Sequence, residues 1–229
     1  MKPFVFINSA MSADGKISTF ARKQVGISGP QDKSRVDALR AESDAIMVGI
    51  GTVLSDDPSL VVKSEALRRS RLDRGLPENP LRIIADSMAR TPTDAKVLGD
   101  GCIIAVSKSA LADDMARLSG KCEIVRCGGT RVDLEELMSV LYEREVRRLM
   151  VEGGATLNWS LITAGLVDEI YVYIGSMLIG GEDAPTLVDG DGFSENFPRL
   201  KLIAIERVGE GALLKWSLIK DSPSELSYL

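Results

Sequence analysis

The sequence predicts a single α/β domain over residues 1–229, with a largely parallel central sheet flanked by helices. Three features of the chain support this fold class. Short apolar runs rich in β-branched residues alternate with segments of helical character, which is typical of a parallel sheet covered by helices. Two of these runs pass through glycines straight into a helical segment. The last two runs, within 199–219, flank a glycine-containing turn and predict a C-terminal antiparallel hairpin.

The expected strands are apolar runs bounded by turn residues, and their β-branched and aromatic side chains suit a buried, pleated surface. In chain order they are FVFINSA (4–10), DAIMVGIGT (44–52), PLRIIADS (80–87), GCIIAVS (101–107), CEIVRC (122–127), RLMVEG (148–153) and EIYVYIG (169–175). Helices are expected over 32–42, where Val36 and Leu39 share one side, and at about 109–119, 133–144 and 155–165. The polar segment 64–79 lacks clean periodicity, so we expect an exposed excursion there.

The charge balance argues against nucleic-acid and membrane partners. The chain carries 28 basic and 33 acidic residues, a formal net charge of −5, which gives no general attraction for polyanions. No apolar run approaches the ~20 residues of a membrane span, and the N-terminal apolar run is too short for a secretory signal. We therefore expect a soluble, cytoplasmic protein.

The residue types that are missing also limit the chemistry. The three cysteines, at 102, 122 and 127, form no C-x-x-C pair, and the chain has no His. A zinc site, a disulfide framework and a Ser or Cys triad are therefore not expected. Catalysis would then depend on Lys, Asp, Glu, Ser or Thr side chains, or on a cofactor.

Two strand ends have the character of anion sites. In MVEGGATLN (150–158), a strand runs through Glu152 and two glycines into a helix, so backbone N–H groups and a positive helix end would face a ligand. In GIGTVLSDD (49–57), Thr52 could donate to a phosphate and Asp56 could accept from ribose or amide groups. Simpler explanations stay open, because small residues suit any tight turn and both Thr and Asp can cap a short helix.

Five segments together carry a family resemblance. They are SADGKI, LRAESDAIMVGIGTVLSDDPSL, RIIADS, MVEGGATLN and GLVDEIYVYIGSMLIGG, in that order between residues 12 and 181. They resemble the riboflavin-biosynthesis reductases, whose fold is similar to that of dihydrofolate reductase, and in particular the stand-alone archaeal type. The resemblance implies NADPH as cofactor, hydride transfer to C1′ of a pyrimidine ribosyl phosphate, no metal, and a homodimer.

The same resemblance assigns site residues. Those that match cofactor contacts are Thr52, Asp56, Ser87, Gly153, Gly154, Ala155 and Thr156. Those that match substrate contacts are Lys16, Arg40, Leu60, Lys63 and Glu152, with Lys16 and Glu152 expected to serve the reacting substrate. Arg90 is our candidate for the cofactor 2′-phosphate, because a nearby Arg is the common solution. Gly26 stands where many bacterial members carry a Trp.

The order of the pathway is a further expectation. The chain lacks the H-x-E and C-x-x-C signatures of zinc deaminases, and its first strand is expected at about residue 3, without space for a preceding domain. We therefore expect it to reduce the still-aminated pyrimidine. Two alternatives remain, namely a dihydrofolate-reductase-like enzyme of another substrate and a nucleotide-binding regulator without turnover.

Overall fold

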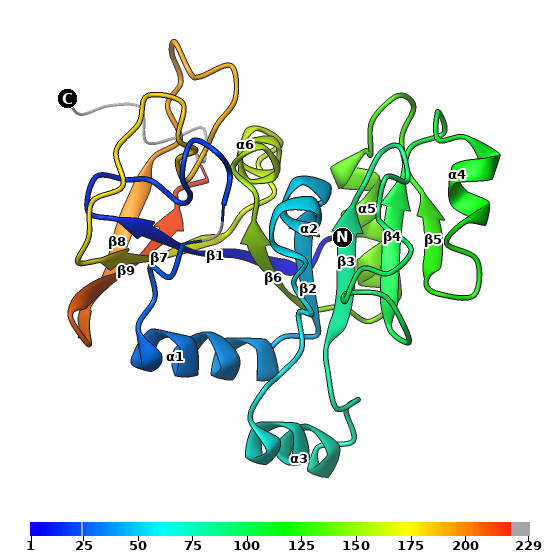
Figure 1. Ribbon diagram of the computed structural model, residues 1–229, viewed down its shortest axis with the longest axis horizontal. Helices are drawn as coiled ribbons and strands as arrows, with labels where there is room; N and C mark the ends of the chain where they lie inside the picture. The colour runs from blue at the N-terminus through cyan, green and yellow to red at the C-terminus, as the bar shows by residue number, and fades with distance from the viewer. Residues whose placement is uncertain (24, 221–229) are drawn as a thin grey trace.

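The computed structural model describes residues 1–23 and 25–220. Within them, one sheet has the strand order β5-β4-β3-β2-β6-β1-β7-β9-β8 (Figure 1). The strands are β1 (Phe4–Ser12), β2 (Ala45–Gly49), β3 (Leu81–Ala85), β4 (Cys102–Val106), β5 (Glu123–Arg126), β6 (Arg148–Gly153), β7 (Glu169–Gly175), β8 (Leu200–Val208) and β9 (Gly211–Leu218). The helices are α1 (Pro30–Ala41), α2 (Ile50–Asp56), α3 (Glu65–Asp73), α4 (Ala112–Ala116), α5 (Leu134–Glu143) and α6 (Ala155–Thr163).

The predicted mixture of strand directions is confirmed. All pairs from β5 through to β7 are parallel, whereas β7 with β9 and β9 with β8 are antiparallel. Parallel strands end at the same edge of a sheet, so the segments that follow β1, β2, β3 and β6 meet there. This edge is where ligands bind in open α/β sheets.

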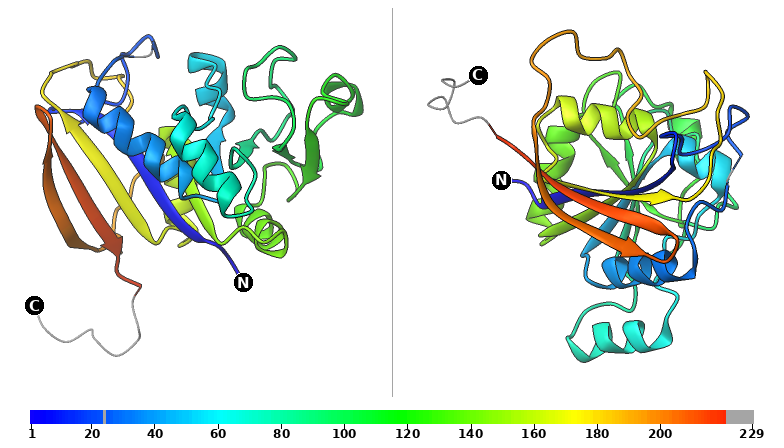
Figure 2. Two further views of the ribbon diagram at one scale, coloured as in Figure 1. Left: turned by 90° about the horizontal axis from the view of Figure 1, so that it is seen from below. Right: turned by 90° about the vertical axis from the view of Figure 1, so that its left-hand side faces the viewer.

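The sheet separates two hydrophobic cores, because successive strand residues point to opposite faces. Ile7 and Val151 pack with Leu161 of α6 and with α5 on one face. Phe6 and Met150 pack with Val53 of α2 and with α1 on the other. Figure 2 shows α6 and α1 on opposite sides of the sheet. Helices therefore cover both faces of the sheet.

Helix α1 differs in detail from its prediction. It begins at Pro30, and its side chains Val36 and Leu39 are only half-buried, whereas two acidic residues, Asp32 and Asp37, are buried. The Asp37 carboxylate accepts the backbone N–H groups of Lys63 at 2.7 Å and of residue 64 at 2.8 Å. Sequence periodicity could not show this, because the partners belong to a distant loop.

The prediction for 64–79 was wrong in one respect. The segment does protrude from the body of the molecule (Figure 1), but it contains α3, and Arg71 within it is 2% exposed. Arg71 donates to the carbonyl oxygens of Ala41, Ser43 and Pro77, each at 2.8 Å. A guanidinium can be buried when carbonyls satisfy its donors.

The other predicted helices are confirmed, although the segment 109–119 contains only the short α4. No helix in the described part of the chain is long and apolar enough to cross a membrane.

Candidate active site

A cleft of about 1060 Å³ lies at the carboxyl edge of the strands. Its walls come from the segments after β1, β2, β3, β5 and β6 and from the start of α1. This is large enough for a dinucleotide fragment together with a small substrate, given that drug-sized ligand sites are ~300–1,000 Å³. Most sequence-predicted site residues lie on it or directly behind it.

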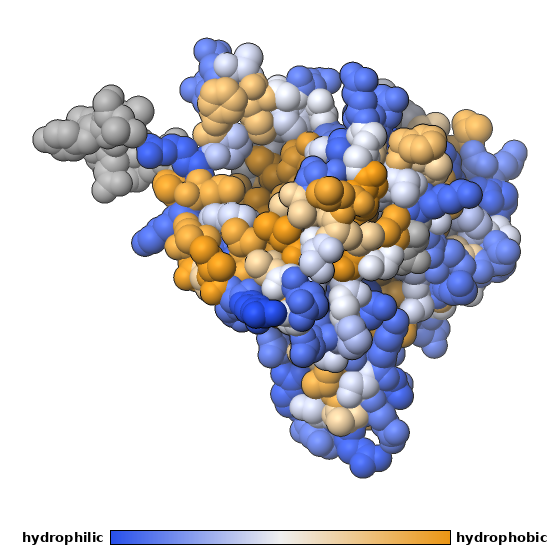
Figure 3. Space-filling view, turned by 60° about the vertical axis from the view of Figure 1, so that its left-hand side comes forward, coloured by the Kyte–Doolittle hydropathy of each residue, from blue (hydrophilic) through white to orange (hydrophobic). Residues whose placement is uncertain are grey.

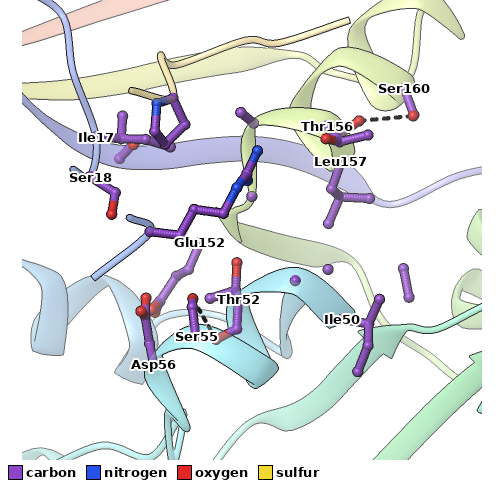
Figure 4. A pocket seen from close by; sticks show the side chains of 18 of the residues that line it. Ile17, Ser18, Ile50, Thr52, Ser55, Asp56, Glu152, Thr156, Leu157 and Ser160 are labelled. Atoms are coloured by element: carbon purple, nitrogen blue, oxygen red, sulfur yellow. Dashed lines mark hydrogen bonds between the residues drawn. The ribbon is translucent and has the colours of Figure 1, made fainter. Parts of the chain in front are cut away.

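The two glycine-containing junctions lie side by side in this cleft, because β2 pairs with β6. The Thr52 hydroxyl donates to the Gly153 carbonyl at 3.4 Å. Gly154 has a φ of 98°, and a Cβ there would stand 3.2 Å from Thr52 Oγ1, so any side chain would be strained and crowded. In Figure 4, Thr52 and Asp56 lie on α2 and Thr156 lies on α6, and all three line the cleft.

The start of α6 is open to a ligand. Its N-cap, Gly154, provides no side-chain hydrogen bond to the N–H groups of the first turn. These donors and the positive end of the helix therefore stay available at the cleft. The predicted cofactor residues that line the cleft are Thr52, Asp56, Ser87, Arg90, Gly154, Ala155 and Thr156. Gly153 contributes its carbonyl to Thr52 and does not itself line the wall.

Glu152 lies on the cleft wall and is paired with Arg40. Arg40 Nε and Nη2 donate to the two carboxylate oxygens at 2.6 and 2.7 Å, and Nη1 donates to the Val61 carbonyl at 3.0 Å. Burial by itself lowers the pKa of Arg40, but the Glu152 carboxylate reverses this and the pKa is raised overall. The ion pair therefore sets the direction of the Glu152 side chain in the cleft.

An irregularity in β6 explains why the carboxylate is available at this point. Met47 of β2 pairs with Val151, but the next residue, Val48, pairs with Gly153. Glu152 is thus the extra residue of a bulge, and bulges beside active sites commonly redirect one side chain. The sequence predicted Glu152 at a strand end but gave no sign of the bulge.

Four predicted substrate residues do not line the cleft, namely Arg40, which lies behind Glu152, and Lys16, Leu60 and Lys63. Lys16 donates from Nζ to the Ala184 carbonyl at 2.9 Å, and its neighbours Ile17 and Ser18 line the wall instead. Leu60 is 1% exposed in the core below α2 and has a φ of 52°. Lys63 has an exposed side chain on the loop that Asp37 and Arg40 hold. Their substrate roles stay predictions.

Asn8 is a site residue that sequence reasoning missed. It lies on β1 in the cleft wall and is 6% exposed, and its Oδ1 atom has no hydrogen-bond partner among the described residues. Ile7 of β1 pairs with Val151 of β6, and Asn8 and Glu152 are the next residues on these two neighbouring strands. A polar residue inside the apolar run FVFINSA was the available signal, since buried polar groups need partners.

Basic side chains stand on opposite sides of the junctions along the cleft. Arg22 and Lys33 line it on the β1 and α1 side. Arg90 and Arg131 line it from the segments after β3 and β5. Gly26 also lines the cleft, and no heavy atom lies within 4 Å of the place a Cβ would take. The cleft therefore offers cations for phosphate groups at both ends.

Comparisons with known proteins point to one family. The family model described as RibD C-terminal domain matches residues 3–214. The protein of Archaeoglobus fulgidus named 2,5-diamino-6-ribosylamino-4(3H)-pyrimidinone 5′-phosphate reductase is 49% identical over 213 residues, which cover 92% of this chain and 96% of that protein.

Solved structures confirm the predicted dihydrofolate-reductase-like fold. RibD from Acinetobacter baumannii matches with a TM-score of 0.78 at 24% identity, over 96% of this chain and 59% of that one. Dihydrofolate reductase from Enterococcus faecalis, complexed with NADP(H), matches with a TM-score of 0.53 at 14% identity, over 95% of this chain and 97% of that one. At these identities the likeness concerns the fold.

Proposed function

The chain belongs to the RibD C-terminal domain family, and we propose on this basis that it is an NADPH-dependent reductase of riboflavin biosynthesis. Its substrate would be 2,5-diamino-6-(ribosylamino)-4(3H)-pyrimidinone 5′-phosphate, the compound named for its relative from Archaeoglobus fulgidus. The ribosyl side chain would be reduced to the ribityl form. The observation that carries the proposal is one cleft in which the open start of α6 lies beside the oriented Glu152 carboxylate.

The residues at the junctions fit a nicotinamide dinucleotide. The first turn of α6 would hold the pyrophosphate, because its backbone N–H donors have no competing capping side chain. The Thr52 hydroxyl would add a donor by giving up its long bond, 3.4 Å, to the Gly153 carbonyl. Gly154 permits close approach of a ligand to the backbone. Ser87, Arg90 and Asp56 would contact the nucleoside parts of the cofactor. NADPH, when bound, supplies the hydride.

Glu152 would recognise the pyrimidine. Each of its oxygens accepts one bond from Arg40 and keeps further lone pairs for N–H groups of the substrate. Asn8, next to it, has an acceptor without a protein partner. A site built to hydrogen-bond a substrate rejects analogues that lack the matching groups, because its own buried polar atoms then lose their partners. Lys16 donates to the Ala184 carbonyl beside the wall residues Ile17 and Ser18, and its role toward the reacting substrate stays a prediction.

Turnover with purified substrates tests the proposal. We expect NADPH to be oxidised with the ribosylaminopyrimidine and not with dihydrofolate. The loss of absorbance of the reduced nicotinamide measures this oxidation. Turnover with dihydrofolate alone would favour the alternative enzyme, and cofactor binding without any turnover would favour a regulator. We also expect higher kcat/KM for the 2,5-diamino compound than for its deaminated counterpart, and the reverse order would change the assigned substrate.

A homodimer is part of the proposal, and the face of the β8–β9 hairpin supports it. β8 is an edge strand. Its exposed apolar side chains are Leu200, Leu202, Ile203 and Ile205, between 43% and 64% exposed. Figure 3 shows hydrophobic side chains gathered over this hairpin. Exposed apolar patches and unpaired strand edges commonly bind another chain. Ile205→Lys should therefore shift the protein to monomer in sedimentation velocity, while Lys201→Glu should not. The cytoplasmic location stays a prediction.

A further inference from the structure

Two of the three cysteines stand at matching positions on neighbouring strands. The first paired residues of β4 and β5 are Ile103 and Glu123, and Cys102 and Cys122 are the residues directly before them. Their Cα atoms are therefore about one strand spacing apart, ~4.8 Å. This separation lies within the ~4.4–6.8 Å that a disulfide bond spans.

Both thiols also point to the same face of the sheet. Cys102 is 2% exposed in the core that contains Phe6, and the half-buried Cys122 packs against the same core. Cys127, the third cysteine, belongs to the core on the opposite face, as the alternation of side chains along a strand requires. All three thiols are free in the structure. Only Cys102 and Cys122 share both a face and a register position.

A hollow of about 420 Å³ gives small molecules access to this pair. Both cysteines line it, together with Gly99, Gly101 and Gly120. The hollow lies at the amino edge of β4 and β5, whereas the cleft lies at the carboxyl edge, and among the described residues the two share no lining residue. A reaction in the hollow therefore does not involve the cleft.

The environment of the thiols disfavours the charged form. Burial raises the pKa of Cys102 to about 12, with a further contribution from the neighbouring Cys122, and burial also raises the pKa of Cys122. The cations that line the hollow are engaged with other groups, since Lys121 donates to a backbone carbonyl and Arg144 donates to the Glu123 carboxylate. Burial opposes a thiolate but not an uncharged disulfide, so the pair suits a bond that forms slowly and then persists.

We propose that Cys102 and Cys122 form a disulfide bond when the protein meets a low-molecular-weight disulfide such as glutathione disulfide. The thiolate of Cys122, the more exposed of the two, attacks one sulfur of the reagent and releases one thiol. The thiolate of Cys102 then attacks the Cys122 sulfur of the mixed disulfide and releases the second thiol. Two protein thiols are thereby oxidised to one S–S bond, and the reagent is reduced to two thiols that take up both protons.

The bond would secure the end of the sheet. β5 has four residues and is the edge strand beside β4 (Figure 1). A bond from Cys102 to Cys122 would close a loop of about 20 residues, which restricts the unfolded chain. We expect Tm of the oxidised protein to exceed that of the reduced protein by roughly 5–10 °C.

Oxidation of the complete, folded protein tests the proposal. The protein is incubated with glutathione disulfide, its remaining thiols are alkylated after unfolding, and its peptides are mapped by mass spectrometry. We expect one alkylated thiol, at Cys127, and one cross-linked peptide that joins Cys102 and Cys122. Tm should rise as stated, and dithiothreitol should reverse the rise. Cys127→Ala is the matched control, which should give the same cross-link and the same rise, whereas Cys122→Ala should give neither.

Three results would overturn the proposal. Both thiols could stay free in the folded protein under conditions that oxidise the urea-unfolded chain, which would show that the fold keeps them apart. A stable glutathione adduct at Cys122 without a cross-link would show that Cys102 does not reach it. An equal rise of Tm in Cys122→Ala would show that the reagent acts elsewhere. Each result leaves the proposed function untouched, because the hollow and the cleft are separate.

Discussion

Replacement of Glu152 by Gln changes both the ion pair with Arg40 and the surface of the cleft. Its carboxylate receives two charge-assisted hydrogen bonds from Arg40, at 2.6 and 2.7 Å, and it also lines the cleft. The variant keeps the shape of the side chain but removes its charge and one acceptor. Arg40 keeps only its bond to the Val61 carbonyl and one bond to the Gln oxygen.

The expected loss of stability follows from the burial of the pair. The side chains of Arg40 and Glu152 are 13% and 14% exposed, so the pair lies between an exposed ion pair, worth ~0–1 kcal/mol, and a fully buried one, whose disruption costs ~3–5 kcal/mol. We expect the free energy of unfolding to fall by about 1–3 kcal/mol, which lowers Tm by roughly 2–12 °C for a domain of this size.

The expected catalytic loss is separate. A lost charge-assisted contact to substrate of ~1.5–3 kcal/mol reduces kcat/KM by roughly 10- to 10²-fold. The assays are thermal unfolding, steady-state kinetics at a temperature well below Tm, and calorimetric titration of NADPH, whose Kd should not change. Glu78→Gln is the control, because Glu78 also pairs with an arginine, Arg68, but its carboxylate is 54% exposed and does not line the cleft. Near-normal kcat/KM together with a lowered Tm would refute a substrate role and leave Glu152 as the partner of Arg40.

Three further changes probe other groups. Asn8→Leu should lower kcat/KM at least tenfold while Tm is kept or raised, because the buried Oδ1 without a partner costs the folded protein ~1–3 kcal/mol until a ligand pairs with it; unchanged kinetics would exclude contact with a ligand. Arg71→Met should lower the free energy of unfolding in urea by about 2–4 kcal/mol, since the carbonyls of Ser43 and Pro77 lose their arginine donor and that of Ala41 keeps only the bond from Arg74, and a loss under 1 kcal/mol would contradict this. Hydrogen bonds from Ser12, Ile179 and Gly180 lower the pKa of Asp14 from 3.8 to about 2, so its stabilising effect is complete above about pH 4 and is lost as the pH falls through about 2. Asp14→Asn should therefore be less stable than wild type at pH 7, and the difference should shrink as the pH falls from about 4 and vanish only below about 2; a difference that does not change between pH 7 and pH 2 would show that ionisation is not the cause.

The sequence alone determined the strands, their order and most of the helices, but not α2 and α3. These depend on local properties, namely β-branched apolar runs, helical periodicity and glycines at places where the chain must turn. For the same reason the junctions at Thr52 and at Gly153–Gly154 could be predicted as ligand sites before their proximity was known, since parallel strands necessarily end at one edge.

The tertiary structure decided which side chains act together. Arg40 and Glu152 are 112 residues apart in the chain, and nothing local to either residue shows that they form a bidentate pair. The same holds for the carbonyls that bury Arg71 and for the hydrogen bond from Val132 to Ser87, which joins the segments after β5 and β3. The type of a residue fixes how many hydrogen bonds its side chain can make. The packing of distant segments decides which partners lie within reach, and which polar atoms, such as Oδ1 of Asn8, are left for a ligand.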